Sequence, residues 1–466
     1  MQIKFGTDGW RAIIGQDFTT ANVARVAKAT ADWLKSKNGT LTAVIGHDAR
    51  FGGQLFTETA AKVLVNEGIK VFMAADMIST PMLSLACHQL AAGIGIVITA
   101  SHNPPAYNGY KLKSNYGGPT SPNEISILEN LIEEEVAVPR LSIDQLISAG
   151  QVEIINMEDL YHDHVIKSFN IEKIRTSGIV FAYDAMYGAG QRIVPRLLPD
   201  IVTLHCEDNP GFKGTAPEPL HKNLQEFSKL IAASTDIEFG FANDGDADRI
   251  GAYDSKGNFV DSHHILLLLI HYLHKHKGMT GKVVVSFTVS NRVRKLCKLY
   301  GLPIEVTKVG FKYICDIMIA EDVLVGGEES GGIAVKGHIP ERDGVWNALV
   351  LMEYMASTGK SIDELIQDIY SIVGSFAYER YDLHITEELK QRIVAKCQAG
   401  DFKSFGPYEV KEVETIDGWK YHLDENSWVM IRASGTEPVL RVYSESNTQA
   451  EVFKILDTVK DILMQQ

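Results

Sequence analysis

The sequence predicts an α/β protein with three similar α/β domains and a C-terminal α+β domain. Three observations lead to this prediction. The chain has 466 residues, which is too long for one hydrophobic core. A fixed order of short apolar runs occurs three times along it, and the pattern changes in the last segment, 375–466. Hydrophobic residues make up 45% of the chain and charged residues 22%, as is typical of globular proteins.

The apolar runs that indicate strands fall into three blocks. They cover 42–46, 70–74 and 94–98, then 179–183, 201–205 and 237–242, then 282–286, 304–307 and 323–325. The first run of each block leads into a polar or glycine-containing turn, and the third leads into an unusual polar segment. Those polar segments are 99–104, 243–249 and 326–332. This order predicts three similar α/β domains, and ligands bind at the loops beyond the ends of such sheets.

The expected domain boundaries follow from these blocks: 1–150, 151–255, 256–374 and 375–466. The opening segment 5–11 mixes glycines with an acid and a base, which is unlike a buried strand. Thr20 is expected to cap a helix whose apolar face contains Val23, Val26 and Leu34.

The last segment is expected to form a small α+β domain. Strands at 429–431 and 440–443 flank a polar loop. The chain then ends in an amphipathic helix. Its apolar face consists of Val452, Ile455, Leu456, Val459, Ile462 and Leu463.

The charge balance limits the classes of partner. Lys and Arg number 45 and Asp and Glu 59, a net charge of −14, which argues against nucleic acid and anionic membranes. An anionic small substrate would need a locally basic site. The aliphatic run 265–270 is too short to span a bilayer, and the first residues lack an apolar signal segment. Five scattered cysteines without a C-x-x-C pair favour reduced thiols and a cytoplasmic location.

Ser101 follows the apolar run 94–98, and Asn103 and Pro104 then interrupt regular structure. A serine held on a loop at the end of a core strand, beside His102, suits a nucleophile or a phosphate carrier. Serine and asparagine also commonly bond to their own turn. This stretch alone is compatible with both interpretations.

The segment Asp244-Gly245-Asp246-Ala247-Asp248-Arg249 carries the strongest metal signal. Carboxylates at alternate positions can point the same way, and three hard oxygen ligands suit Mg²⁺. An EF-hand would need glycine at Arg249 and glutamate at Ser255, which excludes it. The remaining alternative is an acidic turn between two strands.

Two further loops carry polar groups suited to a sugar phosphate. The loop 432–438 combines Arg432 with two hydroxyls and a glycine, which makes a phosphate cradle without a Walker lysine. Arg441 adds a second guanidinium. The loop 326–332 places two acids and a hydroxyl between glycines, a pattern that suits sugar hydroxyls but is also common in plain turns.

Five histidines between 263 and 276 resemble a metal-binding tract. They lack carboxylate partners at matching spacing, so an exposed or half-buried helix face is the preferred interpretation. They are His263, His264, His271, His274 and His276.

Taken in order, the serine, aspartate, Glu/Ser and arginine loops resemble those of the α-D-phosphohexomutase family, and closest its phosphoglucomutase-like members. The resemblance runs from 5–11 to 432–438. It implies three similar α/β domains and a C-terminal domain around a central cleft. It also implies that Ser101 is a phosphoserine, which phosphorylates a hexose monophosphate to a 1,6-bisphosphate and then recovers the other phosphoryl group. A hexose 1,6-bisphosphate would prime the enzyme.

The resemblance also assigns roles to individual residues. Asp244, Asp246 and Asp248, with a phosphoserine oxygen of Ser101, would bind Mg²⁺, which neutralises charge on the moving phosphoryl group. Lys111 matches the general acid/base, with a pKa lowered by neighbouring cations. The residues implied to surround the reacting centre are Arg11, His102 and Arg249. Those implied to bind the sugar are Glu328, Ser330 and Arg342. Those implied to hold the second phosphate are Arg432, Ser434, Gly435, Thr436 and Arg441.

Two departures from the family pattern bear on the sugar. Gly332 stands where bacterial phosphomannomutases and phosphoglucosamine mutases often have histidine. Arg432-Ala433 replaces the Arg-Pro typical of phosphoglucosamine mutases. Both favour glucose phosphate as the small-molecule substrate, with mannose phosphate as a second. The alternatives are a phosphoglucosamine mutase, a metal-dependent phosphatase and a non-catalytic sugar-phosphate sensor.

Overall fold

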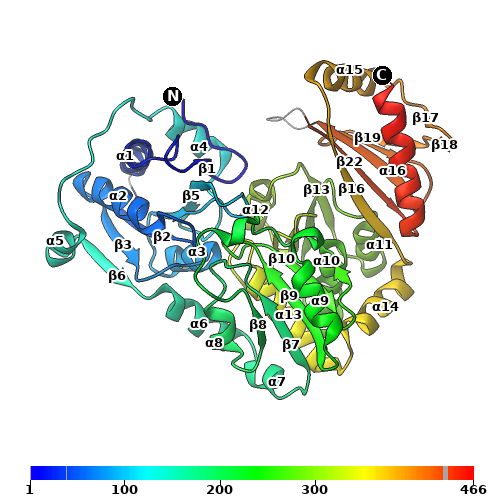
Figure 1. Ribbon diagram of the computed structural model, residues 1–466, viewed down its shortest axis with the longest axis horizontal. Helices are drawn as coiled ribbons and strands as arrows, with labels where there is room; N and C mark the ends of the chain where they lie inside the picture. The colour runs from blue at the N-terminus through cyan, green and yellow to red at the C-terminus, as the bar shows by residue number, and fades with distance from the viewer. Residues whose placement is uncertain (1, 38, 434–438, 466) are drawn as a thin grey trace. The chain divides into compact units, whose positions relative to one another are not determined.

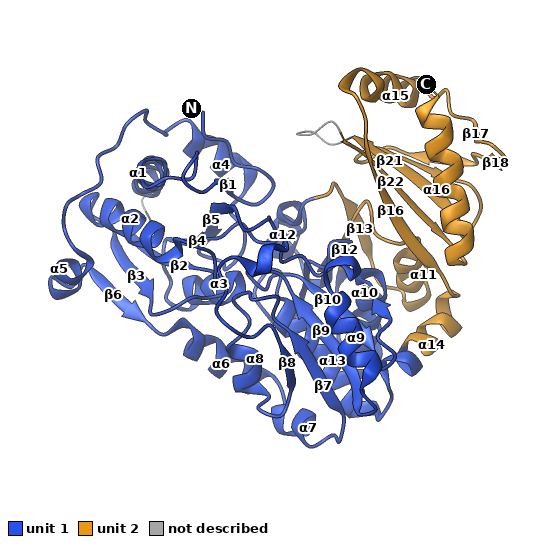
Figure 2. Cartoon of the chain, viewed as in Figure 1, with its two compact units in different colours: residues 1–282, 310–365 blue, residues 283–309, 366–466 orange. Residues whose placement is uncertain are grey.

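The computed structural model describes residues 2–37, 39–433 and 439–465 (Figure 1). The chain forms two compact units (Figure 2). One contains 1–282 and 310–365, and the other contains 283–309 and 366–466. Each of the five cysteines is a free thiol. Among the described residues, no helix combines the length and apolarity needed to cross a membrane.

The first sheet of the larger unit has six strands in the order β1-β5-β4-β2-β3-β6. They are β1 (Trp10–Ile13), β2 (Thr42–His47), β3 (Lys70–Ala74), β4 (Ile94–Ile98), β5 (Tyr107–Ser114) and β6 (Val152–Ile155). Strand β2 pairs in parallel with β3 and β4, whereas β5 is antiparallel to β4 and to β1. Every residue of β4 is buried, which explains its continuous apolar sequence. The predicted strand at 94–98 is confirmed.

Two predictions for the first segment are wrong. Residues 10 and 11 belong to strand β1, which pairs antiparallel with Tyr107–Tyr110 of β5. The end of the segment therefore forms an edge strand of the sheet. Helix α1 (Thr20–Ser36) is capped by Thr19, whose hydroxyl accepts a hydrogen bond from the Asn22 amide at 3.2 Å. Thr20 is already inside the helix, because the cap must keep an extended backbone.

Helices flank the sheets of the larger unit. After α1 they are α2 (Gly53–Asn66), α3 (Thr80–Gln89), α4 (Pro122–Glu129), α5 (Ile143–Ser148), α6 (Met157–Ser168), α7 (Ile171–Arg175), α8 (Ile193–Leu197), α9 (Gln225–Ala233), α10 (Ser262–His271), α12 (Phe311–Ala320) and α13 (Gly344–Thr358).

The second sheet repeats the plan of the first. Its order is β11-β10-β9-β7-β8, with β7 (Val180–Asp184) parallel to β8 (Val202–Leu204) and β9 (Ile237–Asn243). Strand β10 (Ile250–Asp254) then returns antiparallel to β9, and β11 (Phe259–Val260) pairs with β10. The aspartate segment 244–249 is therefore the connection of a hairpin.

The third block of strands follows the same plan. Strand β12 (Lys282–Ser286) pairs in parallel with β13 (Ile304–Thr307), and β14 (Val323–Gly327) pairs antiparallel with β15 (Ile333–Val335). The loop 328–332 connects β14 to β15. In all three blocks, the polar loop predicted from the sequence connects a strand to an antiparallel partner: β4 to β5, β9 to β10 and β14 to β15. Both ends of each loop are therefore held at the same end of the sheet.

The smaller unit contains the C-terminal α+β domain. Its antiparallel sheet has the order β16-β22-β21-β20-β19. These strands are β16 (Ala377–His384), β19 (Glu412–Glu414), β20 (Trp419–His422), β21 (Trp428–Ala433) and β22 (Val439–Ser446), with the hairpin β17 (Ser404–Phe405) and β18 (Tyr408–Glu409) beside them in sequence. The helices are α11 (Asn291–Tyr300), α14 (Ile362–Val373), α15 (Glu387–Ala399) and α16 (Gln449–Met464).

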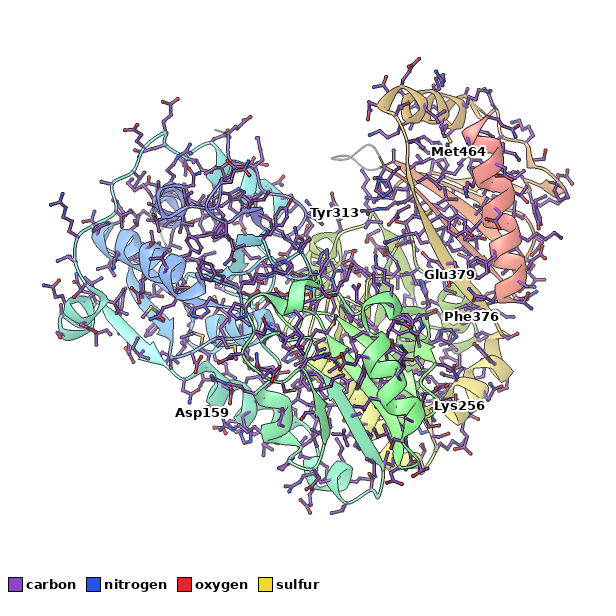
Figure 3. All side chains as sticks on the ribbon, viewed as in Figure 1. Asp159, Lys256, Tyr313, Phe376, Glu379 and Met464 are labelled. Carbon is purple, nitrogen blue, oxygen red and sulfur yellow. The ribbon has the colours of Figure 1, made fainter. Side chains whose placement is uncertain are left out.

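Helix α16 covers this sheet as the apolar pattern predicts. Val452, Ile455, Leu456, Val459 and Leu463 are fully buried, in one cluster with residues of β21 and β22. Met464 at its end points outward and is exposed (Figure 3). The α+β domain is thereby confirmed.

Candidate active site

Ser101 occupies a strained position at the start of the loop between β4 and β5. Its φ is +52°, in the left-handed region that non-glycine residues rarely adopt, and its side chain is buried. The hydroxyl donates a hydrogen bond to Asp244 Oδ2 at 2.7 Å and lies 3.3 Å from His102 Nδ1. The side chain therefore reaches across to the aspartate loop, whereas an ordinary turn serine bonds within its own turn.

The three aspartates of the β9–β10 loop converge. Each offers one carboxylate oxygen within 4.8 Å of the others, and all three are buried. Asp246 Oδ1 and Asp248 Oδ1 have no hydrogen-bond partner, which is costly for buried polar atoms. Unpartnered, hard oxygen atoms that converge in this way fit a divalent cation such as Mg²⁺. No histidine takes part in such a group among the described residues. In the histidine tract, His263 is buried and His264 Nδ1 lies 2.7 Å from Asp261 Oδ1, so the expectation of an exposed or half-buried face without carboxylate partners is wrong for these two histidines.

Burial and mutual repulsion affect these carboxyls unequally. Burial, followed by the charges of Asp248 and Asp246, raises the pKa of Asp244 well above its usual range. Burial also acts to raise the pKa of Asp246, but the Lys111 charge and the hydrogen bonds from Lys111 and Thr80 outweigh it and lower that pKa. The loop thus has one carboxyl that favours the protonated form and one that is firmly ionised.

Lys111, on β5, is fully buried among carboxylates. Its Nζ lies 2.7 Å from Asp246 Oδ2, 3.2 Å from Asp248 Oδ2 and 2.9 Å from Asp8 Oδ2. Burial alone would lower its pKa, but the three carboxylates outweigh burial and raise it. The expectation that cations lower this pKa is therefore wrong, because the immediate neighbours of the amine are acids.

His102 and two arginines complete the surroundings of Ser101. Burial, followed by the charges of Arg249 and Arg11, lowers the pKa of His102 well below its usual range, so the imidazole is neutral. Arg11 donates to Asn103 Oδ1 at 2.7 Å, in the serine loop. Arg249 donates to Glu218 Oε1 at 3.2 Å.

Arg342 faces the same carboxylates. Its guanidinium forms ion pairs with Asp8 and, at 2.6 Å, with Asp248 Oδ2, and its side chain is buried. The resemblance implied a sugar contact for this residue. In the structure, its donors are directed at the carboxylate cluster.

The Glu/Ser loop is tied to the aspartate loop through backbone atoms. The amide of Ile250 donates to the carbonyl of Gly331 at 3.1 Å. Gly331 has a φ of +87°, and a Cβ there would lie 2.4 Å from the Ile250 carbonyl oxygen, so only glycine fits. Glu328 Oε1 accepts a hydrogen bond from the Gly310 amide at 2.8 Å, and Ser330 is half-buried. The two loops are therefore fixed relative to each other.

The arginines of the smaller unit form a separate cationic pair. Arg432 on β21 and Arg441 on β22 stand directly opposite each other, an arrangement that is unfavourable without counter-charge. Arg432 Nε donates to Asp417 Oδ2 at 3.0 Å, and Arg441 Nε lies 3.8 Å from Asp382 Oδ1. Ser434, Gly435 and Thr436 lie outside the described residues.

Several residues around the site were not identified from the sequence. Asp8 pairs with Lys111 and Arg342, and its only signal was its place in the opening segment 5–11. Thr80 donates to Asp246 Oδ2 at 2.5 Å, and nothing in its local sequence marks it. Asp48 and Arg50 lay within a polar turn that the repeat had already singled out.

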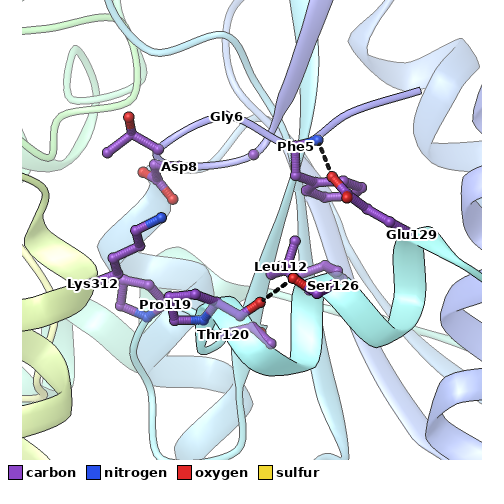
Figure 4. Close-up of a pocket in the computed structure, with 13 residues that line it drawn as sticks. Phe5, Gly6, Asp8, Leu112, Pro119, Thr120, Ser126, Glu129 and Lys312 are labelled. Atoms are coloured by element: carbon purple, nitrogen blue, oxygen red, sulfur yellow. Dashed lines mark hydrogen bonds between the residues drawn. The ribbon is translucent and has the colours of Figure 1, made fainter. Parts of the chain in front are cut away.

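Asp8 also lines a small cavity (Figure 4). Phe5, Thr120, Glu129 and Lys312 contribute to its walls, and the Phe5 amide donates to Glu129 Oε1 at 2.6 Å. The volume of about 140 Å³ is below the range of typical small-molecule sites. This cavity is therefore too small to be the substrate site.

Comparison with known proteins covers nearly the whole chain. Residues 2–138, 159–257 and 261–373 match the phosphoglucomutase/phosphomannomutase α/β/α domains I, II and III, and residues 387–462 match the C-terminal domain. A probable phosphoglucosamine mutase of Methanothermobacter thermautotrophicus is 30% identical over 463 residues, covering 98% of this chain and 97% of the relative. A phosphoglucomutase/phosphomannomutase of Thermococcus kodakarensis is 28% identical and covers 97% and 96%.

A solved structure agrees with these matches. The crystal structure of a putative phosphomannomutase from Thermus thermophilus is 31% identical, with a TM-score of 0.88, and covers 100% of this chain and 99% of that one. The likeness therefore extends over all four domains in sequence and in fold.

The buried carboxyl of Glu328 leads to a pH prediction. Burial raises its pKa from 4.5 to about 7, so the folded state holds this proton more tightly than the unfolded state does. Its stabilising effect is complete below about pH 4.5 and is lost as the pH rises through about 7. The unfolding free energy of the wild type minus that of Glu328→Gln should fall by up to about 3 kcal/mol between pH 5 and pH 8.

Urea unfolding of both proteins at each pH measures this difference. Glu134→Gln, at an exposed position, controls for the loss of one carboxylate. A difference between wild type and Glu328→Gln that does not change with pH would contradict the prediction.

Proposed function

Because this chain belongs to the phosphoglucomutase/phosphomannomutase family and is a phosphohexomutase, we propose that it interconverts glucose 1-phosphate and glucose 6-phosphate through a phosphorylated Ser101. Mannose phosphates are the second proposed substrates. The observation that carries the proposal is the geometry of Ser101. A buried serine in the left-handed region, with its hydroxyl on Asp244 at 2.7 Å, is strained, and such strain is concentrated at functional sites.

The proposed reaction has two balanced steps. Phosphoserine 101 gives its phosphoryl group to a free hydroxyl of the hexose monophosphate: the Oγ–P bond breaks, a sugar O–P bond forms, and the sugar proton returns to Oγ. The bisphosphate then gives its other phosphoryl group back to Ser101, and the proton of Oγ passes to the freed sugar oxygen. The product is the isomeric monophosphate, and the phosphoserine is restored.

Lys111 is proposed to act in its charged form. Burial would lower its pKa, but three carboxylates outweigh burial and raise it, so the ammonium keeps its proton and would stabilise a departing oxygen by its charge and a hydrogen bond. The neutral imidazole of His102, 3.3 Å from Ser101 Oγ, is free to accept one. We therefore propose Lys111 as a charged hydrogen-bond donor and His102 as a proton acceptor in the reaction.

Asp244, Asp246 and Asp248 are proposed to hold Mg²⁺ together with a phosphoserine oxygen. Their fit rests on the two unpartnered Oδ1 atoms of Asp246 and Asp248. When bound, the ion would neutralise charge that develops on the transferred phosphoryl group.

The remaining cations and polar groups are proposed to bind the substrate. Arg11, Arg249 and Arg342 give an acidic protein the locally basic site that a sugar phosphate requires. Glu328 and Ser330 would bond to sugar hydroxyls. The cationic pair Arg432 and Arg441, with Ser434, Gly435 and Thr436, would hold the phosphate that is not reacting, since opposed guanidinium groups favour an anion. The proposed domains are 1–150, 151–255, 256–374 and 375–466, and the sequence of each contains one of these loops.

The main alternative substrate is a glucosamine phosphate. The relative from Methanothermobacter thermautotrophicus is named a probable phosphoglucosamine mutase. Gly332 and Ala433 depart from the pattern of such enzymes and support glucose or mannose. A hexose 1,6-bisphosphate is the proposed activator, since only the phosphorylated serine can begin the cycle.

A substrate panel tests the proposed function. Purified protein with Mg²⁺ and glucose 1,6-bisphosphate should convert glucose 1-phosphate with the highest kcat/KM, followed by mannose 1-phosphate. A clear preference for glucosamine 1-phosphate would overturn the proposed sugar. Release of inorganic phosphate without isomer formation would instead indicate a phosphatase. Ser101→Ala should abolish turnover, and Ser148→Ala, at an exposed helix end, should not.

The proposed metal site leads to a second test. Mg²⁺ should raise the melting temperature of the wild type, and chelation should remove both this shift and the activity. Asp246→Asn should lose the shift, because it removes the negative charge of one of the two carboxylates that carry an unpartnered oxygen atom. The matched control is Asp261→Asn, which can still cap α10, where Asp261 accepts from two backbone amides. An unchanged Mg²⁺ shift in Asp246→Asn would contradict the assignment.

A further inference from the structure

A buried turn lies directly beneath the serine loop. It follows β2 and consists of residues 48–50, and Asp48 Oδ1 accepts a hydrogen bond from the Arg50 amide at 2.9 Å. The side chains of Asp48 and Arg50 are fully buried, with Arg50 Nε 3.3 Å from Asp48 Oδ2. Burying the two charges of this ion pair costs desolvation free energy. The other contacts of Asp48 and Arg50 therefore indicate which part of the structure the pair supports.

The guanidinium of Arg50 binds the backbone of the serine loop at four points. One terminal nitrogen donates to the carbonyls of Ser101 and Asn103, both at 2.6 Å. The other donates to those of Pro104 and Tyr107, both at 3.0 Å. All four acceptors lie between 101 and 107, and a rigid planar fork is needed to reach them together.

Asp48 reaches the same loop through Thr99. The Thr99 hydroxyl donates to Asp48 Oδ2 at 2.5 Å and accepts a hydrogen bond from the Ser101 amide at 2.9 Å. Arg50 already holds the Ser101 carbonyl. The turn therefore fixes both backbone polar groups of Ser101, and these contacts offset the strain of its left-handed φ of +52°.

The second α/β domain has the same device in the equivalent place. At the end of β7, Asp184 Oδ1 accepts from the Met186 amide at 2.7 Å, two residues ahead as in the first domain. Three residues further on, the Ala189 amide donates to the carbonyl of Gly245 in the aspartate loop at 3.0 Å. The turn at the end of β2 thus supports the loop after β4, and the turn at the end of β7 supports the loop after β9.

We infer that Arg50 is a positioning residue for phosphoryl transfer, because it holds the Ser101 loop in the conformation that directs Oγ toward Asp244. This inference rests on the proposed role of Ser101 as the phosphorylated residue. Arg50 itself contacts neither the hydroxyl nor the carboxylates of Asp246 and Asp248. The ring of Phe212 lies 5.0 Å from the guanidinium carbon and covers it.

Arg50→Lys in the full-length enzyme tests the inference, since lysine keeps the charge but lacks the fork. With Mg²⁺ and glucose 1,6-bisphosphate, the rate of phosphoryl uptake by Ser101, followed by intact mass, should fall on the order of 100-fold, as a misplacement of about 1 Å predicts. The kcat should fall in parallel while KM changes little. Thr99→Val should show a smaller loss of the same kind, and Thr99→Ser should restore the rate.

Arg25→Gln is the matched control. Arg25 is another buried arginine of the same domain, and its Nε donates to the Glu133 carbonyl at 2.6 Å, away from the serine loop. Arg25→Gln should lower the melting temperature without changing kcat. If Arg50→Lys retains wild-type phosphorylation and kcat, or if its loss is no larger than that of an equally destabilised Arg25→Gln, the inference is overturned.

Failure of the proposed function gives a different result. If Ser101→Ala still takes up a phosphoryl group and turns over substrate, the role of Ser101 is wrong, whatever the Arg50 variant does. If Arg50→Lys does not fold, the Thr99→Val and Thr99→Ser pair decides: equal rates in both would overturn the inference.

Discussion

The buried ion cluster around Lys111 is the constraint on which the rest of the site depends. The amine is in contact with Asp8, Asp246 and Asp248, and Arg342 pairs with Asp8 and Asp248. Removing so many charges from water costs several kcal/mol for each ion, and only close pairing offsets that cost. The cluster therefore holds the segment before β1, strand β5, the aspartate loop and the segment before α13 together, because none of its members can move without leaving a charge unpaired.

The fold supplies the geometry that this cluster needs. In each of the three blocks, a buried strand ends in a loop and an antiparallel strand carries the chain back. Both ends of the loop are thus fixed by sheet hydrogen bonds, and the loop has little freedom. Two of these loops are further joined by the bond between Ile250 and Gly331. A reaction that moves a phosphoryl group by positioning and charge stabilisation depends on such rigidity.

Local pattern was sufficient to predict much of this arrangement. The fully buried strand at 94–98, the aspartate segment at 244–249 and the amphipathic helix that ends the chain each carry a periodicity or a composition that one kind of structure explains. Their order along the chain indicated the repeat. These features depend on residues close in sequence, so they can be predicted without knowledge of the tertiary contacts.

The features that were missed depend on distant partners. The pKa of Lys111 is set by Asp8, Asp246 and Asp248, and no local pattern shows that a lysine on β5 faces them. In the sequence, Arg50 is only a polar residue in a turn. Its role becomes visible in the folded structure, where it donates hydrogen bonds to the carbonyls of Ser101, Asn103, Pro104 and Tyr107. Likewise, Thr19 and Thr20 are equally good caps in sequence, and only the extended backbone of Thr19 distinguishes them.

Transfer of a labelled phosphoryl group through the serine tests the central claim most directly. Enzyme is primed with ³²P-labelled glucose 1,6-bisphosphate and isolated. One portion is digested to locate the label by peptide mass spectrometry, and a second portion is chased with unlabelled glucose 6-phosphate for one turnover. We expect the label on Ser101 and then, after the turnover, in the phosphate of glucose 1-phosphate, because the unlabelled 6-phosphoryl group returns to the serine. Label on another residue, or label released as inorganic phosphate during the chase, would contradict the phosphoserine account.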